Sequence, residues 1–289
     1  MYNSISETVK LSNGVEMPRF GLGVWMAEDP DELVNAIKYA VKIGYRSIDT
    51  AAQYGNEEAT GRGIRECGIP REEIFLTTKL LNYDQKFKDK AGMIAGFEES
   101  LNRLGTDYVD LYLMHWPLNE GKKFLEAWDA IVDIYRSGRA RAIGVCNFHI
   151  HNIEDIISHS GVAPMVNQCE CHPWLNQKEL IAYCRGKGIQ FECYSPLMHG
   201  KLAEMPELAD IGKKYGKTPA QVTLRWHLQN GCVIIPKSVH ENRILENSGI
   251  FDFELTAQEM QYIDSQNRNE RFLPDPDLDL TFSPPPEDK

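Results

Sequence analysis

The sequence predicts a (β/α)8 barrel, and three observations lead to this fold class. Short apolar segments typical of buried strands alternate with segments of helical spacing along the 289 residues. Eight strand–helix units are counted, and eight units in roughly 250 residues are typical of this barrel. A doubly wound nucleotide-binding sheet would carry a G-x-G-x-x-G turn after its first strand, and none follows the first strand here.

The expected strands are continuous apolar runs, which is the pattern of parallel strands covered on both faces. The runs Tyr108–Met114, Ala142–Val145 and Val233–Ile235 show it most clearly. In chain order the strands are expected at residues 20–24, 45–49, 74–79, 108–115, 140–145, 164–169, 189–194 and 232–236.

The expected helices lie between these strands and carry apolar residues three and four positions apart. The first, at 30–43, begins at Pro30 and is followed by Gly44, and these residue types favour a helix start and a helix end. The others are expected at 56–67, 90–103, 124–137, 151–160, 177–187, 206–214, 218–230, 241–248 and 256–265.

The two ends of the chain differ from the barrel at 20–265. Alternating residues around Asn13-Gly14 predict a hairpin at 8–18, which acts as a lid or plug. Prolines in the tail at 267–289 exclude a helix, so we expect an ordered loop over the barrel mouth up to about Phe282 and a frayed end beyond it. Residues 1–289 are expected to form one domain.

The composition argues against several classes of protein. The net charge of −11 argues against nucleic acid as a partner, because phosphates call for a basic surface. Seven cysteines without framework spacing are typical of a reducing cytosol. Neither a secretory signal nor an apolar stretch of membrane-spanning length is visible. We therefore expect a cytoplasmic protein with no membrane partner.

Polar residues stand at the carboxyl ends of the strands, where barrels of this kind carry their active sites. A purely structural role does not explain why polar residues recur at the end of strand after strand, each directly after an apolar run. They are Asp49, Lys79, His115, Cys146-Asn147, Asn167-Gln168, Tyr194-Ser195 and Lys237-Ser238.

Asp49 and Lys79 end neighbouring strands, so we expect them to form a buried ion pair. A buried lysine would lower the pKa of Tyr54 from about 10. Tyr54 would then donate a proton to a developing alkoxide while His115 orients the carbonyl oxygen. Alone, Tyr54 could be a surface loop residue and His115 a turn residue before Trp116-Pro117, but the Asp–Lys pair favours the catalytic interpretation.

None of these groups supplies a hydride, so a redox cofactor is expected. The segment 235–243 places Lys237, Ser238 and Arg243 at a helix start, which suits the 2′-phosphate of NADP, although charged helix starts are common. Asn147, Gln168 and Ser195 could bind a carboxamide. Tyr194 could stack on a nicotinamide ring, although an aromatic residue at a strand end is often core.

These residues resemble the aldo-keto reductase family over essentially the whole chain. The segments 44–51, 142–148 and 235–243 are similar to its three signatures. The resemblance implies NADPH-dependent carbonyl reduction, with cofactor binding first and Asp49, Tyr54, Lys79 and His115 as the catalytic tetrad. The implied cofactor contacts are Gly23, Val24, Trp25, Asp49, Cys146, Asn147, Gln168, Tyr194, Ser195, Leu197, Lys237, Ser238, Val239, Arg243, Glu246 and Asn247. The implied substrate contacts are Trp25, Tyr54, Leu81, His115 and Trp116.

Pro274–Asp277, the short tail, and Asn167-Gln168 followed by Glu170 and His172-Pro173 are most similar to one branch of the family. The branch includes diketogluconate reductases, glyoxal and methylglyoxal reductases, and microbial prostaglandin F synthases. Reduction of aldehydes, dicarbonyls and activated ketones is therefore expected, with prostaglandin F synthase-type reduction of an endoperoxide as an alternative.

Three residues depart from the pattern of this branch. Leu81 replaces a usual tryptophan, which implies a smaller, aliphatic pocket wall. Cys146 replaces the commoner serine, which weakens one carboxamide hydrogen bond and leaves a thiol that could be oxidised near the cofactor. Tyr194 replaces a frequent tryptophan. These departures leave the substrate open.

Two rival functions were weighed. A metal-dependent hydrolase could use Cys169, Cys171 and His172, but strand alternation separates the histidine from the thiols and Lys79 would repel a cation. No metal is therefore expected. A non-enzymatic NADP-binding regulator would be favoured by an incomplete tetrad, and here all four residues are present. The expected partner is a small-molecule carbonyl substrate, and the expected state is a monomer.

Overall fold

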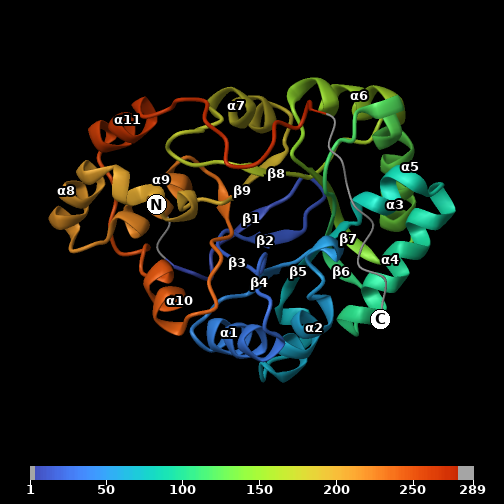
Figure 1. Ribbon diagram of the computed structural model, residues 1–289, viewed down its shortest axis with the longest axis horizontal. Coiled ribbons are helices and arrows are strands. Elements are labelled where there is room, and N and C mark those ends of the chain that lie inside the picture. The colour runs from blue at the N-terminus through green and yellow to red at the C-terminus, as the bar shows by residue number, and fades with distance from the viewer. Residues whose placement is uncertain (1–3, 279–289) are drawn as a thin grey trace.

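The computed structural model describes residues 4–278 and contains a parallel sheet curved into a barrel (Figure 1). The strands lie in the order β10-β9-β8-β7-β6-β5-β4-β3. They are β3 (Leu22–Gly23), β4 (Ser47–Asp49), β5 (Phe75–Leu80), β6 (Val109–Met114), β7 (Ala140–Cys146), β8 (Val166–Glu170), β9 (Gln190–Tyr194) and β10 (Val233–Ile234). The predicted (β/α)8 barrel is confirmed.

The barrel closes between its first and last strands. Parallel bridges join Phe20 to Ile234 and Gly23 to Lys237. A β-carbon at Gly23 would lie 2.8 Å from the Ile235 carbonyl oxygen, so a larger residue would push the two backbones apart. Glycine at this position therefore permits closure.

The helices pack around the outside of the sheet (Figure 1). They are α1 (Pro30–Lys42), α2 (Glu57–Glu66), α3 (Asn82–Phe87), α4 (Lys90–Leu104), α5 (Lys123–Arg136), α6 (Ile150–Ser160), α7 (Lys178–Gly186), α8 (Pro206–Tyr215), α9 (Pro219–Gln229), α10 (Glu241–Ser248) and α11 (Ala257–Ser265). The sequence predicted all of them except α3, whose six residues are too few to show a helical period. None of the helices within residues 4–278 is both long and apolar enough to cross a lipid bilayer.

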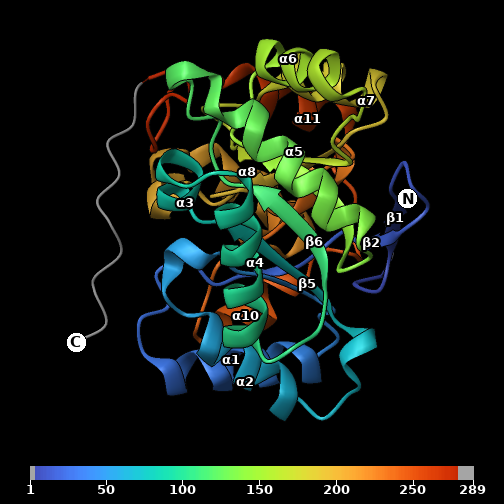
Figure 2. The same cartoon turned by 90° about the vertical axis from the view of Figure 1, so that its right-hand side faces the viewer.

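The hairpin lies at the end of the barrel away from the predicted site. Its strands β1 (Thr8–Lys10) and β2 (Glu16–Pro18) pair antiparallel, and the Asn13 side chain donates to the carbonyl of Arg141 near the start of β7. Figure 2 shows the hairpin on the side opposite the C-terminal segment. Of the two roles expected for the hairpin, its position at the amino ends of the strands fits a plug and not a lid over the predicted site.

The C-terminal segment lies over the mouth of the barrel, as predicted. The amides of Phe272 and Leu273 donate to the Glu170 carboxylate at the end of β8, at 2.7 and 3.2 Å. The amide of Glu270 donates to the Trp174 carbonyl at 3.1 Å. Phe282 and the final prolines lie outside the described residues, so the prediction of a frayed end remains a prediction.

Candidate active site

A cavity of about 840 Å³ lies at the carboxyl ends of the strands. This volume is within the range of small-molecule and cofactor sites, roughly 300–1,000 Å³. Most of the predicted site residues line it: Gly23, Trp25, Asp49, Tyr54, His115, Trp116, Cys146, Asn147, Gln168, Tyr194, Ser195, Leu197, Lys237, Ser238, Arg243, Glu246 and Asn247.

Four predicted residues do not line the cavity. Lys79 is fully buried beneath Tyr54, and Val24 is buried in the barrel core. Val239 packs against the same core. Leu81 does not form a pocket wall, because α3 begins immediately after it and Asn82 lines the cavity instead.

The sequence analysis missed other lining residues, which are Met26, Gln53, Asn82, Pro196, His199, Gly200, Leu202, Ala220, Ile235, Pro236 and Leu273. One of these residues is His199, which follows β9. Its Nε2 lies 3.0 Å from Ser195 Oγ, and its ring contacts the rings of Trp25 and Phe272. The long interval between the predicted strand at 189–194 and the predicted helix at 206–214 could have indicated these residues, since long loops in a compact domain often cover a site.

The Lys79 ammonium group is the centre of the predicted tetrad. Its Nζ lies 2.7 Å from Asp49 Oδ1, 2.9 Å from the Thr50 carbonyl oxygen and 3.2 Å from the Tyr54 hydroxyl. All three N–H groups of the ammonium therefore have an acceptor. Such a lysine is held charged without access to water, and its charge is directed at the phenol.

A short turn places Tyr54 above this lysine. Residues Ala52–Tyr54 form a 3-10 helix that ends at Gly55 in the left-handed conformation, with φ 67°. Asn56 fastens the turn, because its side chain accepts from the Thr50 hydroxyl and donates to the Val24 carbonyl. The rings of Tyr54 and His115 meet at 5.7 Å and 72°. Their polar groups thus share one end of the cavity.

The pKa values differ from the expectation for Tyr54 and suit a proton donor. Burial raises the pKa of Tyr54 above 10, and the opposing charge of Lys79 does not cancel this effect, so the predicted lowered pKa is wrong. Burial alone would lower the pKa of Lys79, but the Asp49 carboxylate outweighs it and the pKa is raised. At neutral pH the site therefore contains a charged amine and a protonated phenol.

His115 is neutral in this environment. Burial, helped by the charge of Lys79, lowers its pKa well below 6.5. A neutral imidazole carries one N–H, so His115 is able to donate a single hydrogen bond into the cavity. It does this without adding a second positive charge beside Lys79.

A buried chain of hydrogen bonds extends the tetrad across the barrel. Gln168 Nε2 donates to Asp49 Oδ2 and to Glu192 Oε2, each at 2.8 Å. Glu192 is completely buried, and burial together with the Asp49 charge raises its pKa to about 8. The sequence analysis did not identify Glu192, although strand alternation places it on the same face as Tyr194.

Asn147 and Tyr194 hold each other in place. The Tyr194 hydroxyl donates to Asn147 Oδ1 at 2.6 Å, and Asn147 Nδ2 donates to the His115 carbonyl at 3.0 Å. The tyrosine ring lines the cavity in a fixed orientation. The neighbouring Cys146 is 1% exposed, and burial raises the pKa of its thiol. Because oxidation requires an accessible thiolate, the structure does not favour Cys146 as an oxidation site.

Two basic residues also line the cavity. Lys237 and Arg243 are exposed there beside Ser238, Glu246 and Asn247. Within residues 4–278 neither cation is paired with a carboxylate: Lys237 Nζ donates to the Met26 carbonyl at 3.1 Å. Glu246 accepts from a threonine hydroxyl at 2.7 Å. The two cations are therefore available to an anionic ligand.

Comparisons with known proteins agree with this geometry. The model of the Aldo/keto reductase family matches residues 19–268. The chain belongs to the aldo-keto reductase family. The glyoxal reductase of Bacillus subtilis (strain 168) is 52% identical over 277 residues, covering 96% of this chain and 99% of that protein. The 9,11-endoperoxide prostaglandin H2 reductase of Trypanosoma cruzi (strain CL Brener) is 45% identical over 272 residues, covering 93% and 94%.

A solved structure in the same family is also similar. The aldo-keto reductase of Bombyx mori in complex with NADP has a TM-score of 0.86 at 35% identity, and the match covers 92% of this chain and 94% of that one. The family predicted from the sequence is confirmed. In this aldo-keto reductase the cavity is lined both by Tyr54, above the charged Lys79, and by two cations that pair with no carboxylate of the described residues.

Proposed function

We propose that the protein reduces aldehydes, dicarbonyls and activated ketones to alcohols with NADPH. The observation that carries the proposal is the Lys79–Tyr54 contact of 3.2 Å beside a cavity that Lys237 and Arg243 also line. The first feature suits proton donation to an oxygen, and the second suits a phosphorylated cofactor.

The cofactor proposal is supported by the shape and charge of the cavity. NADPH, when bound, supplies the hydride that the side chains lack. Lys237, Ser238 and Arg243 would hold the 2′-phosphate, and Glu246 and Asn247 would contact the adenosine. Tyr194 would pack against the nicotinamide ring, and Gln168, Asn147 and Ser195 would contact its carboxamide. We propose that the cofactor binds before the substrate.

The proposed mechanism assigns one role to each member of the tetrad. Tyr54 and His115 would donate hydrogen bonds to the carbonyl oxygen, and Tyr54 would give up its proton as negative charge develops there. The charged Lys79, 3.2 Å away, stabilises the phenolate that remains. Asp49 keeps Lys79 in position at 2.7 Å and balances its charge.

The substrate class is supported by the walls of the cavity and by the glyoxal reductase relative. Trp25 and Trp116 supply apolar surface beside the tetrad. The similarity to a prostaglandin H2 reductase keeps endoperoxide reduction as a second candidate. All seven cysteines are free thiols, which supports a reducing compartment such as the cytoplasm. The predicted tetrad is assembled within one chain, so the proposed chemistry needs no second copy, and we propose a monomer.

The test follows NADPH consumption with methylglyoxal, phenanthrenequinone and a prostaglandin endoperoxide. We expect turnover with the dicarbonyl and the quinone, and kcat/KM values rank the substrate classes. NADPH binding without turnover of any carbonyl would refute the enzymatic proposal and favour the non-enzymatic regulator. Higher kcat/KM for the endoperoxide than for every carbonyl would favour the second candidate.

A further inference from the structure

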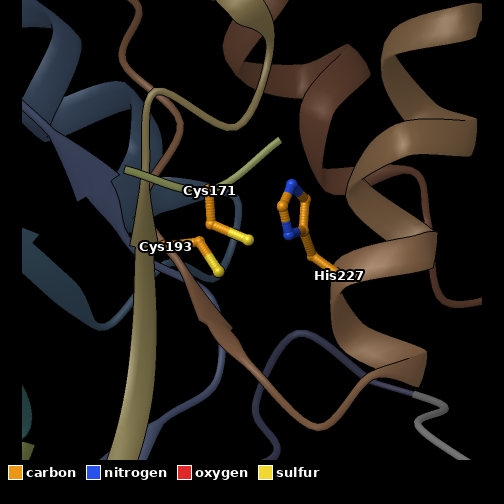
Figure 3. Close-up of side chains that lie close together, drawn as sticks. All are labelled: Cys171, Cys193 and His227. Carbon is orange, nitrogen blue, oxygen red and sulfur yellow. The ribbon is translucent and has the colours of Figure 1, made fainter. Parts of the chain in front are cut away.

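A cluster of two thiols and an imidazole lies outside the cavity, between the sheet and helix α9. The ligand atoms of Cys171, Cys193 and His227 are all within 4.8 Å of one another. Figure 3 shows the Cys171 and Cys193 sulfur atoms near each other, with the His227 imidazole projecting from the helix toward them. None of the three residues lines the active-site cavity. The cluster is therefore separate from the proposed catalytic site.

Three different elements bring these side chains together. Glu192 and Tyr194 face the barrel interior, so Cys193 between them faces outward toward α9. Cys171 directly follows β8, and its amide donates to the Tyr194 carbonyl at 3.3 Å. His227 comes from the last part of α9, whose end leads into β10. From the sequence, Cys171 was considered as a metal ligand together with Cys169 and His172, which are close to it in the chain. In the structure its partners are Cys193 from β9 and His227 from α9.

The His227 imidazole lacks hydrogen-bond partners in a dry environment. The residue is 1% exposed, and neither ring nitrogen makes a hydrogen bond within residues 4–278. The Pro196 backbone lies close to the ring as a weak hydrogen-bond partner, although the contact does not have normal hydrogen-bond geometry. A buried polar group left without a partner destabilises the folded state. An electron-pair acceptor between the imidazole and the thiols would satisfy one nitrogen.

All three candidate ligand groups are buried, and two of them are thiols whose protons a metal ion would displace. A third thiol, that of Cys232, lies near Cys193, but its sulfur is not within 4.8 Å of all three ligand atoms.

We propose that Cys171, Cys193 and His227 form a structural Zn²⁺ site, with Cys232 moving in from outside the cluster as the fourth ligand. Thiolate and imidazole are ligands that zinc prefers, and closed structural sites are tetrahedral. With Zn–S bonds of about 2.3 Å, the Cys171 and Cys193 sulfurs would lie roughly 3.8 Å apart, which requires shifts of about 1 Å or less from the observed three-residue cluster, and Cys232 must move farther. Binding releases the thiol protons and joins the ends of β8 and β9 to α9. The inference does not depend on the proposed reductase activity.

The test uses the full chain, unfolded in chelator and refolded without metal. We expect Co²⁺, used as a probe, to bind at one equivalent per chain with a thiolate-to-cobalt charge-transfer absorption that Zn²⁺ abolishes. Zinc should also raise the Tm by about 5 °C or more. Absence of the charge-transfer band, or a Zn²⁺-independent Tm, would overturn the proposal and leave a cluster of neutral thiols.

Two variants separate metal binding from misfolding. His227→Leu removes the unpartnered nitrogens, so its metal-free Tm should equal or exceed that of the unchanged protein, while the cobalt band and the zinc-induced rise in Tm are lost. Cys67→Ser changes a partly exposed thiol outside the cluster and should keep both metal responses. A cobalt band that persists in His227→Leu, or disappears in Cys67→Ser, would contradict the assignment.

Discussion

The Gln168 amide nitrogen donates a 2.8 Å hydrogen bond to the Asp49 carboxylate. The same nitrogen donates to Glu192, so one amide group separates two buried acids. Only one of these acids has a cation beside it, since Lys79 pairs with Asp49. Of the two acids, Glu192 is therefore the one that binds a proton more readily, which agrees with its pKa of about 8.

The first prediction concerns the pH dependence of stability. A carboxyl whose folded-state pKa is raised from 4.5 to about 8 binds a proton more tightly in the folded protein, so its contribution to the free energy of unfolding falls as pH rises from 4.5 to 8. Glutamine does not titrate, so Glu192→Gln removes this pH-dependent loss of stability. We expect the variant to gain stability relative to the unchanged protein between pH 5 and pH 8, by at most about 5 kcal/mol at 1.36 kcal/mol per pKa unit.

Urea unfolding at pH 5, 6.5 and 8 measures this difference. The exposed Glu179→Gln serves as the control, and it should leave the pH dependence unchanged. Parallel curves for Glu192→Gln and the unchanged protein would show that Glu192 does not hold a proton in the folded state.

The second prediction isolates the proton donor. Tyr54→Phe removes the hydroxyl that lies 3.2 Å from Lys79 and keeps the ring. We expect kcat for carbonyl reduction to fall by about 10²–10⁴-fold while the NADPH dissociation constant stays within about twofold. Steady-state kinetics and an NADPH fluorescence titration measure the two effects. Loss of NADPH binding with the same kcat would mean that the tyrosine holds cofactor rather than donating a proton.

The third prediction concerns the buried ion pair. Lys79→Met leaves the Asp49 carboxylate buried without its cation, which should destabilise the protein by about 3–5 kcal/mol. The double change Lys79→Met with Asp49→Asn removes the uncompensated charge and should recover much of the stability while activity stays lost. Equal destabilisation by the single and double changes in urea unfolding would argue against the pair as a coupled unit.

The fourth prediction tests the phosphate site. Lys237→Met should weaken NADPH binding about 10-fold to 100-fold, because a hydrogen bond to a charged group contributes about 1.5–3 kcal/mol. NADH lacks the 2′-phosphate, so its binding should change little. Lys213→Met, on the exposed face of α8, is the control and should affect neither cofactor. Equal weakening of both cofactors by Lys237→Met would refute the assignment.

Much of the site was predictable because polar residues follow apolar strands. Asp49 and Lys79 each end such a run, and parallel strands bring their ends together, so the ion pair followed from the order of the strands. Tyr54 and His115 were predictable because they lie close in the sequence to the ends of strands. The pKa of Tyr54 was not, because the degree of burial depends on how the whole mouth of the barrel packs.

Other features depend on contacts between distant segments. Glu192 shares a face with Tyr194 in the sequence pattern, but its partner Gln168 is known only once β8 and β9 lie side by side. Leu81 does not line the cavity, and Asn82 lines it instead, at the start of α3, a helix too short to show periodicity. The cluster of Cys171 with His227 joins residues from a strand end and a helix, and no sequence spacing indicates it.

The close approach at Gly23 has a consequence for how the protein is made. The edge of β3 pairs with residues 234–237, which are separated from it by most of the chain. During synthesis the first barrel strand therefore has an edge with unpaired backbone groups until nearly the whole protein has emerged. Folding to a closed barrel is consequently dominated by a late, long-range contact, which is the kind of contact that slows folding and exposes strands to aggregation.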